Sequence, residues 1–277
     1  MDISNLEEIS KNIRKDIIEM VYNAKSGHPG GSLSCTDILV ALYYNKMNLN
    51  LDEKGQRIDK FILSKGHAAP AYYAVLSSVG FIPHEDLKTL RKIDSYLEGH
   101  PTNKINGVDV SSGSLGQGLS IANGMALAKK LDKSQGYVYC LLGDGEIEEG
   151  QIWEASMAAS KNQLDNLCVI LDYNHLQIDG KIEDVAGLVD VGAKFESFGF
   201  KVISVDGHNV EQLIEAFSIA RHQKEMPSII IANTVKGKGV SFMENQASWH
   251  GKAPNKEQYE QAMNELKLKE LNFLERR

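Results

Sequence analysis

The sequence predicts an α/β fold, a doubly wound and mostly parallel sheet with helices on both faces. Short apolar runs alternate with helix-like segments through the second half of the chain, which is the pattern of a parallel sheet. The runs are nearly continuously apolar, as strands are when helices cover both faces. Two consecutive runs end directly in polar residues and glycines, at 143–145 and at 174. The ends of parallel strands are where such sheets bind ligands.

The first half of the chain is predicted to supply helices and loops around one short strand. A capping-box pattern of Ser4 and Glu7 precedes apolar residues at helical spacing and predicts the first helix. The polar, glycine-rich segment 96–118 predicts a long loop, and such loops are usually functional. The expected elements of this half are helix 4–24, loop 26–32, helix 36–45, strand 61–63 and helix 68–79.

The second half is predicted to build most of the sheet. The expected strands are 137–142, 167–172, 201–205 and 228–234. The expected helices are 115–131, 151–160, 191–198 and 210–220, followed by a charged amphipathic tail helix at about 255–277. Because the sequence shows no internal repeat or flexible linker, we expect residues 1–277 to form one domain with a helical tail.

Composition excludes several classes of function. The 277 residues are 42% apolar with a net charge of −7 and no basic stripe, which argues against a nucleic-acid partner. No apolar run reaches the roughly 18 residues of a membrane helix, and the N-terminus does not resemble a signal peptide. The cysteines Cys35, Cys140 and Cys168 lack zinc-site spacing, so we expect a reducing, cytoplasmic setting.

A metal site is predicted where two strands end. Asn174 follows Asp144 by 30 residues, the length of one strand–helix–strand unit, so both oxygens can reach the same edge of the sheet. Carboxylate and amide oxygens beside glycines suit Mg²⁺ that carries a diphosphate. A simple turn is the alternative for an isolated Gly-Asp-Gly. The acidic residues Glu146, Glu148 and Glu149 favour a helix N-terminus and would repel a bare diphosphate, which supports the metal.

Four of the eight histidines lie in loops marked by glycine or proline: His28, His67, His100 and His250. A lone loop histidine is usually an ordinary surface residue. Four in similar contexts predict a pocket for a polyhydroxylated substrate, because imidazoles bind hydroxyls and move protons near neutral pH. The loop Gly113-Ser-Leu-Gly-Gln-Gly118 either approaches a phosphate or serves close packing.

Over about residues 10–253 the chain resembles the N-terminal, diphosphate-binding part of transketolase, a thiamine diphosphate enzyme. The shared motifs, in order, are Ser26-Gly-His-Pro-Gly30, Ser64-Lys-Gly-His67, Gly99-His-Pro101, Val110-Ser-Ser-Gly-Ser-Leu-Gly-Gln-Gly118, Gly143-Asp-Gly145 with Glu148-Glu-Gly150, Asp172-Tyr-Asn174 and Ser248-Trp-His-Gly251. The metal motif alone indicates only the superfamily, and the histidine motifs narrow the resemblance to transketolase. It implies the thiamine diphosphate-binding fold known as the PP domain.

The resemblance implies three groups of site residues. The implied Mg²⁺ ligands, with Ca²⁺ or Mn²⁺ as substitutes, are Asp144, Asn174 and the carbonyl of Leu176. The implied cofactor-binding residues are His67, Gly113, Ser114, Leu115, Gly143, Asp144, Gly145, Glu146, Asn174, Lys236, His250 and Lys252. The implied catalytic residues are His28, His67, His100, His250 and Glu149, the last through an acidic network across a subunit interface.

The resemblance also implies a reaction and a partner. In the family, a two-carbon ketol unit passes reversibly from a ketose phosphate to an aldose phosphate, as in the pentose phosphate pathway. The glutamate that activates the cofactor belongs to a pyrimidine-binding domain, and this chain ends before one begins. We therefore expect a separate C-terminal subunit that supplies the missing domains, with two copies of each chain in a heterotetramer.

Three alternatives stay open at this point. The chain could serve a split transketolase-like enzyme for an unusual sugar phosphate, or another thiamine diphosphate reaction such as that of 1-deoxyxylulose-5-phosphate synthase. The motifs around His100 and His250 favour transketolase over the latter. A non-catalytic regulatory subunit is the third alternative, and the intact Asp144 and Asn174 argue against it. The preferred sugar is not predicted by the sequence.

Overall fold

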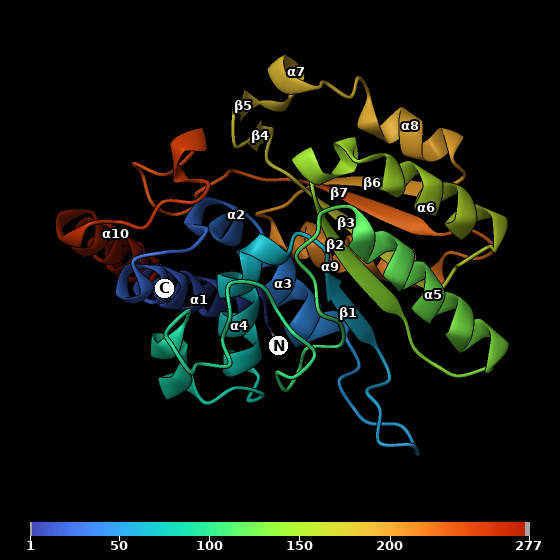
Figure 1. Cartoon of the computed structure of the whole chain (residues 1–277), viewed down its shortest axis with the longest axis horizontal. Helices are drawn as coiled ribbons and strands as arrows, with labels where there is room; N and C mark the ends of the chain where they lie inside the picture. The colour runs from blue at the N-terminus through green and yellow to red at the C-terminus, as the bar shows by residue number, and fades with distance from the viewer. Residues whose placement is uncertain (1, 275–277) are drawn as a thin grey trace.

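The computed structural model describes residues 2–274, with side chains described through residue 267. A five-stranded sheet lies between two groups of helices (Figure 1). Its strand order is β1-β2-β3-β7-β6, and every neighbouring pair is parallel. The strands are β1 (Lys60–Leu63), β2 (Val138–Gly143), β3 (Leu167–Tyr173), β6 (Lys201–Asp206) and β7 (Ser228–Asn233). The predicted parallel α/β sheet is confirmed.

Alternate residues of the central strands pack into two separate cores, one on each face of the sheet. In β3, Cys168 and Ile170 belong to one core, and Val169 and Leu171 belong to the other. The first core includes residues of α1 (Ile3–Ala24), α3 (Thr36–Ala41), α4 (Ala69–Ser78) and α9 (Val210–His222). The second includes residues of α5 (Gln117–Leu131), α6 (Gly150–Lys161) and α8 (Val191–Ser197). Burial on both faces explains why the strands are continuously apolar.

Three details of the N-terminal helices differ from the prediction. The cap of α1 is Asp2 instead of Ser4, because the Asp2 carboxylate accepts a hydrogen bond from the backbone N–H of Asn5 at 2.8 Å. The predicted loop 26–32 contains the short helix α2 (Pro29–Ser34), which begins at a proline whose missing N–H has no role in a first turn. The predicted helix 36–45 is α3 followed by a π-helical turn, η1 (Leu42–Lys46).

The long segment between α4 and α5 is irregular apart from the 3₁₀ turn η3 (His84–Thr89), which agrees with the loop predicted at 96–118. Helix α5 begins two residues later than predicted, after Gly116 with its left-handed φ of 85°. Between Asn174 and α8 lies a region that the sequence did not predict. It comprises a small hairpin, β4 (Leu176–Gln177) and β5 (Gly180–Lys181), and the turn α7 (Ile182–Val185). Two-residue strands are too short to show periodicity.

The tail helix α10 (Lys256–Leu274) packs against α1. The rings of Tyr22 and Tyr259 stack at 4.2 Å, and Ala262 and Leu266 are buried in the first core. Residues 275–277 of the predicted tail lie outside the described residues. No helix within residues 2–274 is both long enough and apolar enough to cross a membrane.

Candidate functional site

A cavity of about 430 Å³ lies at the carboxyl ends of β1, β2 and β3, the edge at which the sequence predicted a ligand. Thirteen of the predicted site residues line it: His67, His100, Gly113, Leu115, Gly143, Asp144, Gly145, Glu146, Glu149, Asn174, Leu176, Lys236 and His250. Three others do not. The ring of His28 contacts those of His67 and His250, and Ser114 and Lys252 are exposed, with Lys252 over the ring of Trp249.

Asp144 and Asn174 lie together at the ends of β2 and β3, as their spacing predicted. One carboxylate oxygen of Asp144 accepts hydrogen bonds from the backbone N–H groups of Asn174 and His175, both at 2.7 Å. The other accepts from the N–H of Gly145 at 2.9 Å. Burial, reinforced by the Asp172 carboxylate, raises the pKa of Asp144 to about 6. Because burial disfavours the charged form of this carboxyl group, a cation bound beside it would stabilise the carboxylate.

Lys236 supplies a positive charge at this point of the cavity. Its Nζ donates to the carbonyl of Leu176 at 3.0 Å and lies 3.1 Å from Nδ1 of His250. Burial lowers the pKa of Lys236 to about 8, and Asp144 acts in the opposite direction. The Leu176 carbonyl, an implied metal ligand, therefore already faces a cation. Together with Asp144 and Asn174 it forms a set of oxygen donors, which is the kind that Mg²⁺ prefers.

Three of the four predicted histidines form a cluster on one wall. The ring centroids of His28 and His67 are 5.3 Å apart, those of His28 and His250 5.4 Å, and those of His67 and His250 5.1 Å. Burial lowers the pKa to about 4 for His28 and about 3 for His250, and well below the ordinary value for His67. The cluster is therefore neutral at pH 7, and each ring offers one donor and one acceptor. His100 is exposed at the rim beside Gly113.

Glu146 lines the cavity, but both of its carboxylate oxygens are used by the protein. One accepts from the N–H of Gly116 at 2.9 Å and from the hydroxyl of Ser64. The other accepts from the N–H of Gly143 at 3.0 Å. The glycine-rich loop is thus tied to the ends of β1 and β2, and a Cβ on Gly118 would overlap the side chain of Ser64. Close packing, one of the two interpretations of this loop, accounts for Gly116 and Gly118.

Glu149 is exposed on the rim of the cavity in the isolated chain. The acidic network across a subunit interface that the resemblance implied for it stays a prediction, since it requires a second chain.

Sequence reasoning missed a buried ion pair at the site, between Lys65, which lines the cavity, and Asp172. Nζ of Lys65 donates to the carboxylate of Asp172 and, at 3.0 Å, to the carbonyl of Gly31. Asp172 also accepts from the hydroxyls of Ser34, at 2.5 Å, and Thr234. Polar residues at two strand ends were the available signal, but nothing in the sequence pairs residues 107 positions apart. The pair connects the ends of β1 and β3 with α2, and Lys65 and Gly31 also line the cavity.

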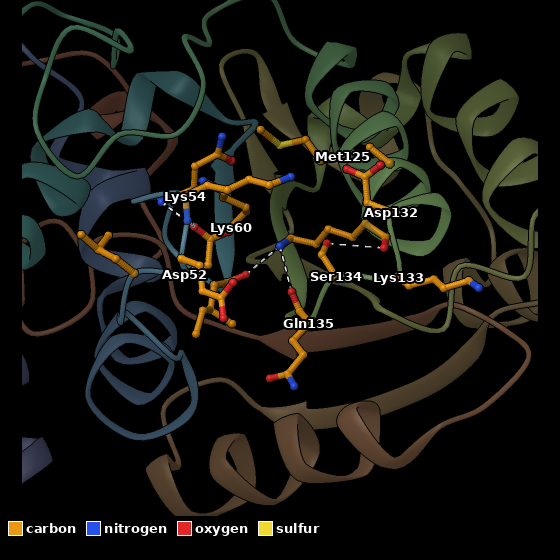
Figure 2. Close-up of a pocket in the computed structure, with 14 residues that line it drawn as sticks. Asp52, Lys54, Lys60, Met125, Asp132, Lys133, Ser134 and Gln135 are labelled. Carbon is orange, nitrogen blue, oxygen red and sulfur yellow. Dashed lines mark hydrogen bonds between the residues drawn. The ribbon is translucent and has the colours of Figure 1, made fainter.

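A larger cavity, about 740 Å³, lies near the amino ends of β1 and β2 (Figure 2). Its lining mixes acidic and basic residues, including Asp52, Lys60 and Asp132. Nζ of Lys60 pairs with Asp109 at 3.3 Å, and Nζ of Lys129 donates to the carbonyls of Ile58 and Gln135. Because these cations serve the protein's own backbone and carboxylates, the chemistry points to the smaller cavity as the functional site.

Residues 6–274 match the family described as transketolase, thiamine diphosphate binding domain. The chain is 43% identical over 267 residues to one of the subunits of the apulose-4-phosphate transketolase of Phocaeicola vulgatus, covering 96% of this chain and 95% of that protein. It is 40% identical over 264 residues to the 6-deoxy-6-sulfo-D-fructose transketolase subunit SqwG of a Clostridium species, covering 95% and 96%.

Longer relatives match over part of their length. Human transketolase is 45% identical over 267 residues, which are 94% of this chain but 42% of that protein. The solved transketolase of Campylobacter jejuni superimposes with a TM-score of 0.88 at 34% identity, covering 96% of this chain and 43% of that one. The chain therefore spans less than half of these proteins and nearly all of the two subunit relatives.

Proposed function

The chain belongs to the transketolase family, and on that premise we propose that it is the diphosphate-binding subunit of a two-chain transketolase. The proposed reaction is reversible transfer of a two-carbon ketol unit from a ketose phosphate to an aldose phosphate. The observation that carries the proposal is that Asp144 and Asn174, paired at the strand ends, line the same cavity as the neutral histidines His67 and His250. Relatives of equal length are named as transketolase subunits, which supports a shared activity.

Thiamine diphosphate and Mg²⁺ are the proposed cofactors. Asp144, Asn174 and the carbonyl of Leu176 would hold the metal, because all three line this cavity and their oxygens already accept from N–H groups or from the Lys236 cation. His67, His250 and Lys236 would meet the diphosphate, with the backbone of Gly145 beside it. When bound, thiamine diphosphate supplies the nucleophilic carbon for breaking and forming the carbon–carbon bond.

The histidine cluster would bind the sugar. His28, His67 and His250 are neutral at pH 7. His67 can donate to one hydroxyl oxygen and accept from another, whereas Nδ1 of His250 already accepts from Lys236, which leaves its Nε2–H to donate. Nδ1 of His28 is buried and has no hydrogen-bond partner among the described residues, which leaves a polar atom unsatisfied next to His67 and His250. His100 at the rim would contact the sugar further from the reacting carbon. A neutral imidazole also accepts a proton from a hydroxyl as the bond breaks.

A second chain would complete the enzyme. We propose that it supplies the pyrimidine-binding and C-terminal domains, that two copies of each chain assemble, and that Glu149 faces this partner. We also propose that residues 1–277 form one domain with α10 as its docked tail, and that the enzyme works in the cytoplasm on sugar phosphates of the pentose phosphate type.

The test is reconstitution. The chain is expressed with a candidate C-terminal subunit encoded beside it, and turnover of xylulose 5-phosphate with ribose 5-phosphate is assayed with thiamine diphosphate and Mg²⁺. Activity only in the mixture is expected. Sustained two-carbon transfer by this chain alone would contradict the two-chain proposal.

A second candidate substrate class has specific support. The two relatives of equal length are named for apulose 4-phosphate and for 6-deoxy-6-sulfo-D-fructose, which are unusual sugars. A donor screen that includes these compounds distinguishes a split enzyme for such a sugar from one for the common pentose phosphates. The second chain sets this preference if it binds the phosphate or sulfonate end.

A further inference from the structure

A buried network behind the cavity holds the turn that carries Lys236. The turn follows β7 and runs from Val235 to Gly239, with left-handed φ angles of 78° at Gly237 and 97° at Gly239. Lys236 is 2% exposed and directs its Nζ to the Leu176 carbonyl. The position of the Lys236 ammonium depends on the position of this turn. The residues that anchor the turn therefore set where the cation lies in the site.

His208 anchors the start of the turn. Its Nδ1 lies 2.7 Å from the Asp37 carboxylate, and its Nε2 accepts a hydrogen bond from the backbone N–H of Val235 at 2.8 Å. Burial acts to raise the pKa of Asp37, but Arg14 and His208 outweigh it, so the pKa is lowered overall and Asp37 is an ionised acceptor. The proton of His208 therefore sits on Nδ1, which leaves Nε2 free to accept.

Arg14 anchors the end of the turn. Its two terminal nitrogens donate to the two Asp37 oxygens at 3.0 and 2.6 Å, and its Nε donates to the carbonyl of Lys238 at 3.2 Å. Arg14 and Asp37 are each 6% exposed. The ion pair between Arg14 on α1 and Asp37 on α3 thus holds the turn at two points. Arg14 binds the Lys238 carbonyl directly, and Asp37 acts on the Val235 N–H through His208.

We propose that Arg14, Asp37 and His208 are positioning residues that fix the turn 235–239, and through it the Lys236 ammonium, for binding the diphosphate. This inference rests on the proposed function, because it assigns Lys236 to that ligand. None of the three residues lines the cavity, so their effect is exerted through the backbone at Val235 and Lys238.

Two substitutions of His208 separate this role from general stability. His208→Gln places an oxygen near the position of Nε2 and keeps an acceptor for the Val235 N–H. His208→Asn reaches only the position of Nδ1, so it keeps the contact with Asp37 and leaves the Val235 N–H without its partner. Binding of thiamine diphosphate with Mg²⁺ is measured by calorimetry on the full chain, and amide hydrogen exchange is measured across residues 235–239.

We expect H208N to weaken binding at least about tenfold, as substitutions behind a ligand site commonly do, and to speed exchange at 235–239. H208Q should stay within about threefold of the wild type in both measurements. Wild-type binding by H208N, or equal losses in both variants, would overturn the proposal. If H208N does not fold, Arg14→Lys keeps the charge beside Asp37 but removes the bond to Lys238, and the same losses are expected.

Hydrogen exchange also separates the two proposals. If the wild-type chain binds no thiamine diphosphate, alone or with its partner, the proposed function fails. Faster exchange at 235–239 in H208N than in H208Q then still supports the anchoring of the turn, and equal exchange refutes it.

Discussion

At the scale of single residues, Asp144 is the side chain on which the cofactor proposal depends. It is 4% exposed and is held by three backbone N–H groups, at Gly145, Asn174 and His175. We predict that Asp144→Asn weakens Mg²⁺-dependent binding of thiamine diphosphate by at least about 100-fold, because a direct ligand contributes more than its supporting residues. Calorimetry in the presence and absence of Mg²⁺ measures the change.

The matched control is Asp132→Asn, which removes an exposed carboxylate near the amino ends of the strands. It should bind the cofactor as the wild type does. A folded D144N variant that keeps wild-type affinity would remove Asp144 from the metal site and leave the Mg²⁺ proposal without its charged ligand.

The half-buried histidines of the cluster lead to a prediction about pH. Burial lowers the pKa of His250 to about 3. Between about pH 6.5 and pH 3 the ring is therefore protonated in the unfolded chain but neutral in the folded chain. The stability contributed by the neutral ring is present above pH 6.5 and is lost as the pH falls. We predict that His250→Gln is less sensitive to a change from pH 7 to pH 5 than the wild type. Denaturant unfolding at both values measures this.

His222→Gln, on the exposed side of α9, is the matched control and should follow the wild-type pH dependence. If H250Q and the wild type lose the same free energy of unfolding between pH 7 and pH 5, the desolvation of His250 does not govern its titration.

Contacts between residues of one strand–helix–strand unit could be predicted from the sequence. Contacts between segments that are far apart in the sequence could not. The 30-residue spacing placed Asp144 beside Asn174 because one strand–helix–strand unit has that length. The Lys65–Asp172 pair joins positions 107 residues apart, and no local pattern records it. Contact of Glu146 with the cofactor stays a prediction, whereas its bonds to Ser64, Gly116 and Gly143 could not be predicted from sequence spacing.

At the scale of elements, α5 offers two glycines with opposite roles. A Cβ at Gly118 would overlap Ser64, whereas a Cβ at Gly124 would meet no atom within 4 Å. We predict that Gly118→Ala lowers the free energy of unfolding by about 1–3 kcal/mol through overpacking. Gly124→Ala should raise it by about 0.5–1 kcal/mol, because alanine favours the helix. Denaturant unfolding of both variants measures the difference. A stable Gly118→Ala variant would mean that α5 can shift away from β1 at little cost.

Strands were predicted within about one residue because burial on both faces leaves a continuous apolar run, which only the ends of a strand interrupt. The region from Leu176 to Val185 was missed because its strands have two residues each. Helix α2 was missed for a different reason. Its glycines and proline are typical of loops, but tertiary packing buries all six of its residues against the sheet and its helices.

At the scale of the whole molecule, the cavity is built from both halves of the chain, and part of its lining is exposed to solvent. The second half supplies the strand ends with Asp144 and Asn174, and the first half supplies His67 and the glycine-rich loop. Two apolar residues of its lining remain exposed, Leu115 at 38% and Ile178 at 67%. Apolar side chains beside a polar cavity are a surface that a second chain can cover. The arrangement supports a site completed at an interface.

Substitutions of Glu149 and Glu146 can separate a role at the partner interface from a role within the chain. Glu149 is exposed, whereas Glu146, three residues earlier, is buried. Glu149 is exposed on the rim, so Glu149→Gln should change the free energy of unfolding of this chain by no more than about 0.5 kcal/mol. It should nevertheless lower the activity of the mixture and weaken assembly with the C-terminal subunit. Glu146→Gln should destabilise the chain itself by about 1–3 kcal/mol, because its amide would face N–H groups that now donate to a carboxylate.

Denaturant unfolding of the chain alone, and titration of the partner followed by sedimentation, separate these effects. If Glu149→Gln assembles and turns over as the wild type does, Glu149 has no part in the interface. The partner must then complete the site through other residues of the rim, of which Leu115 and Ile178 are the exposed apolar candidates.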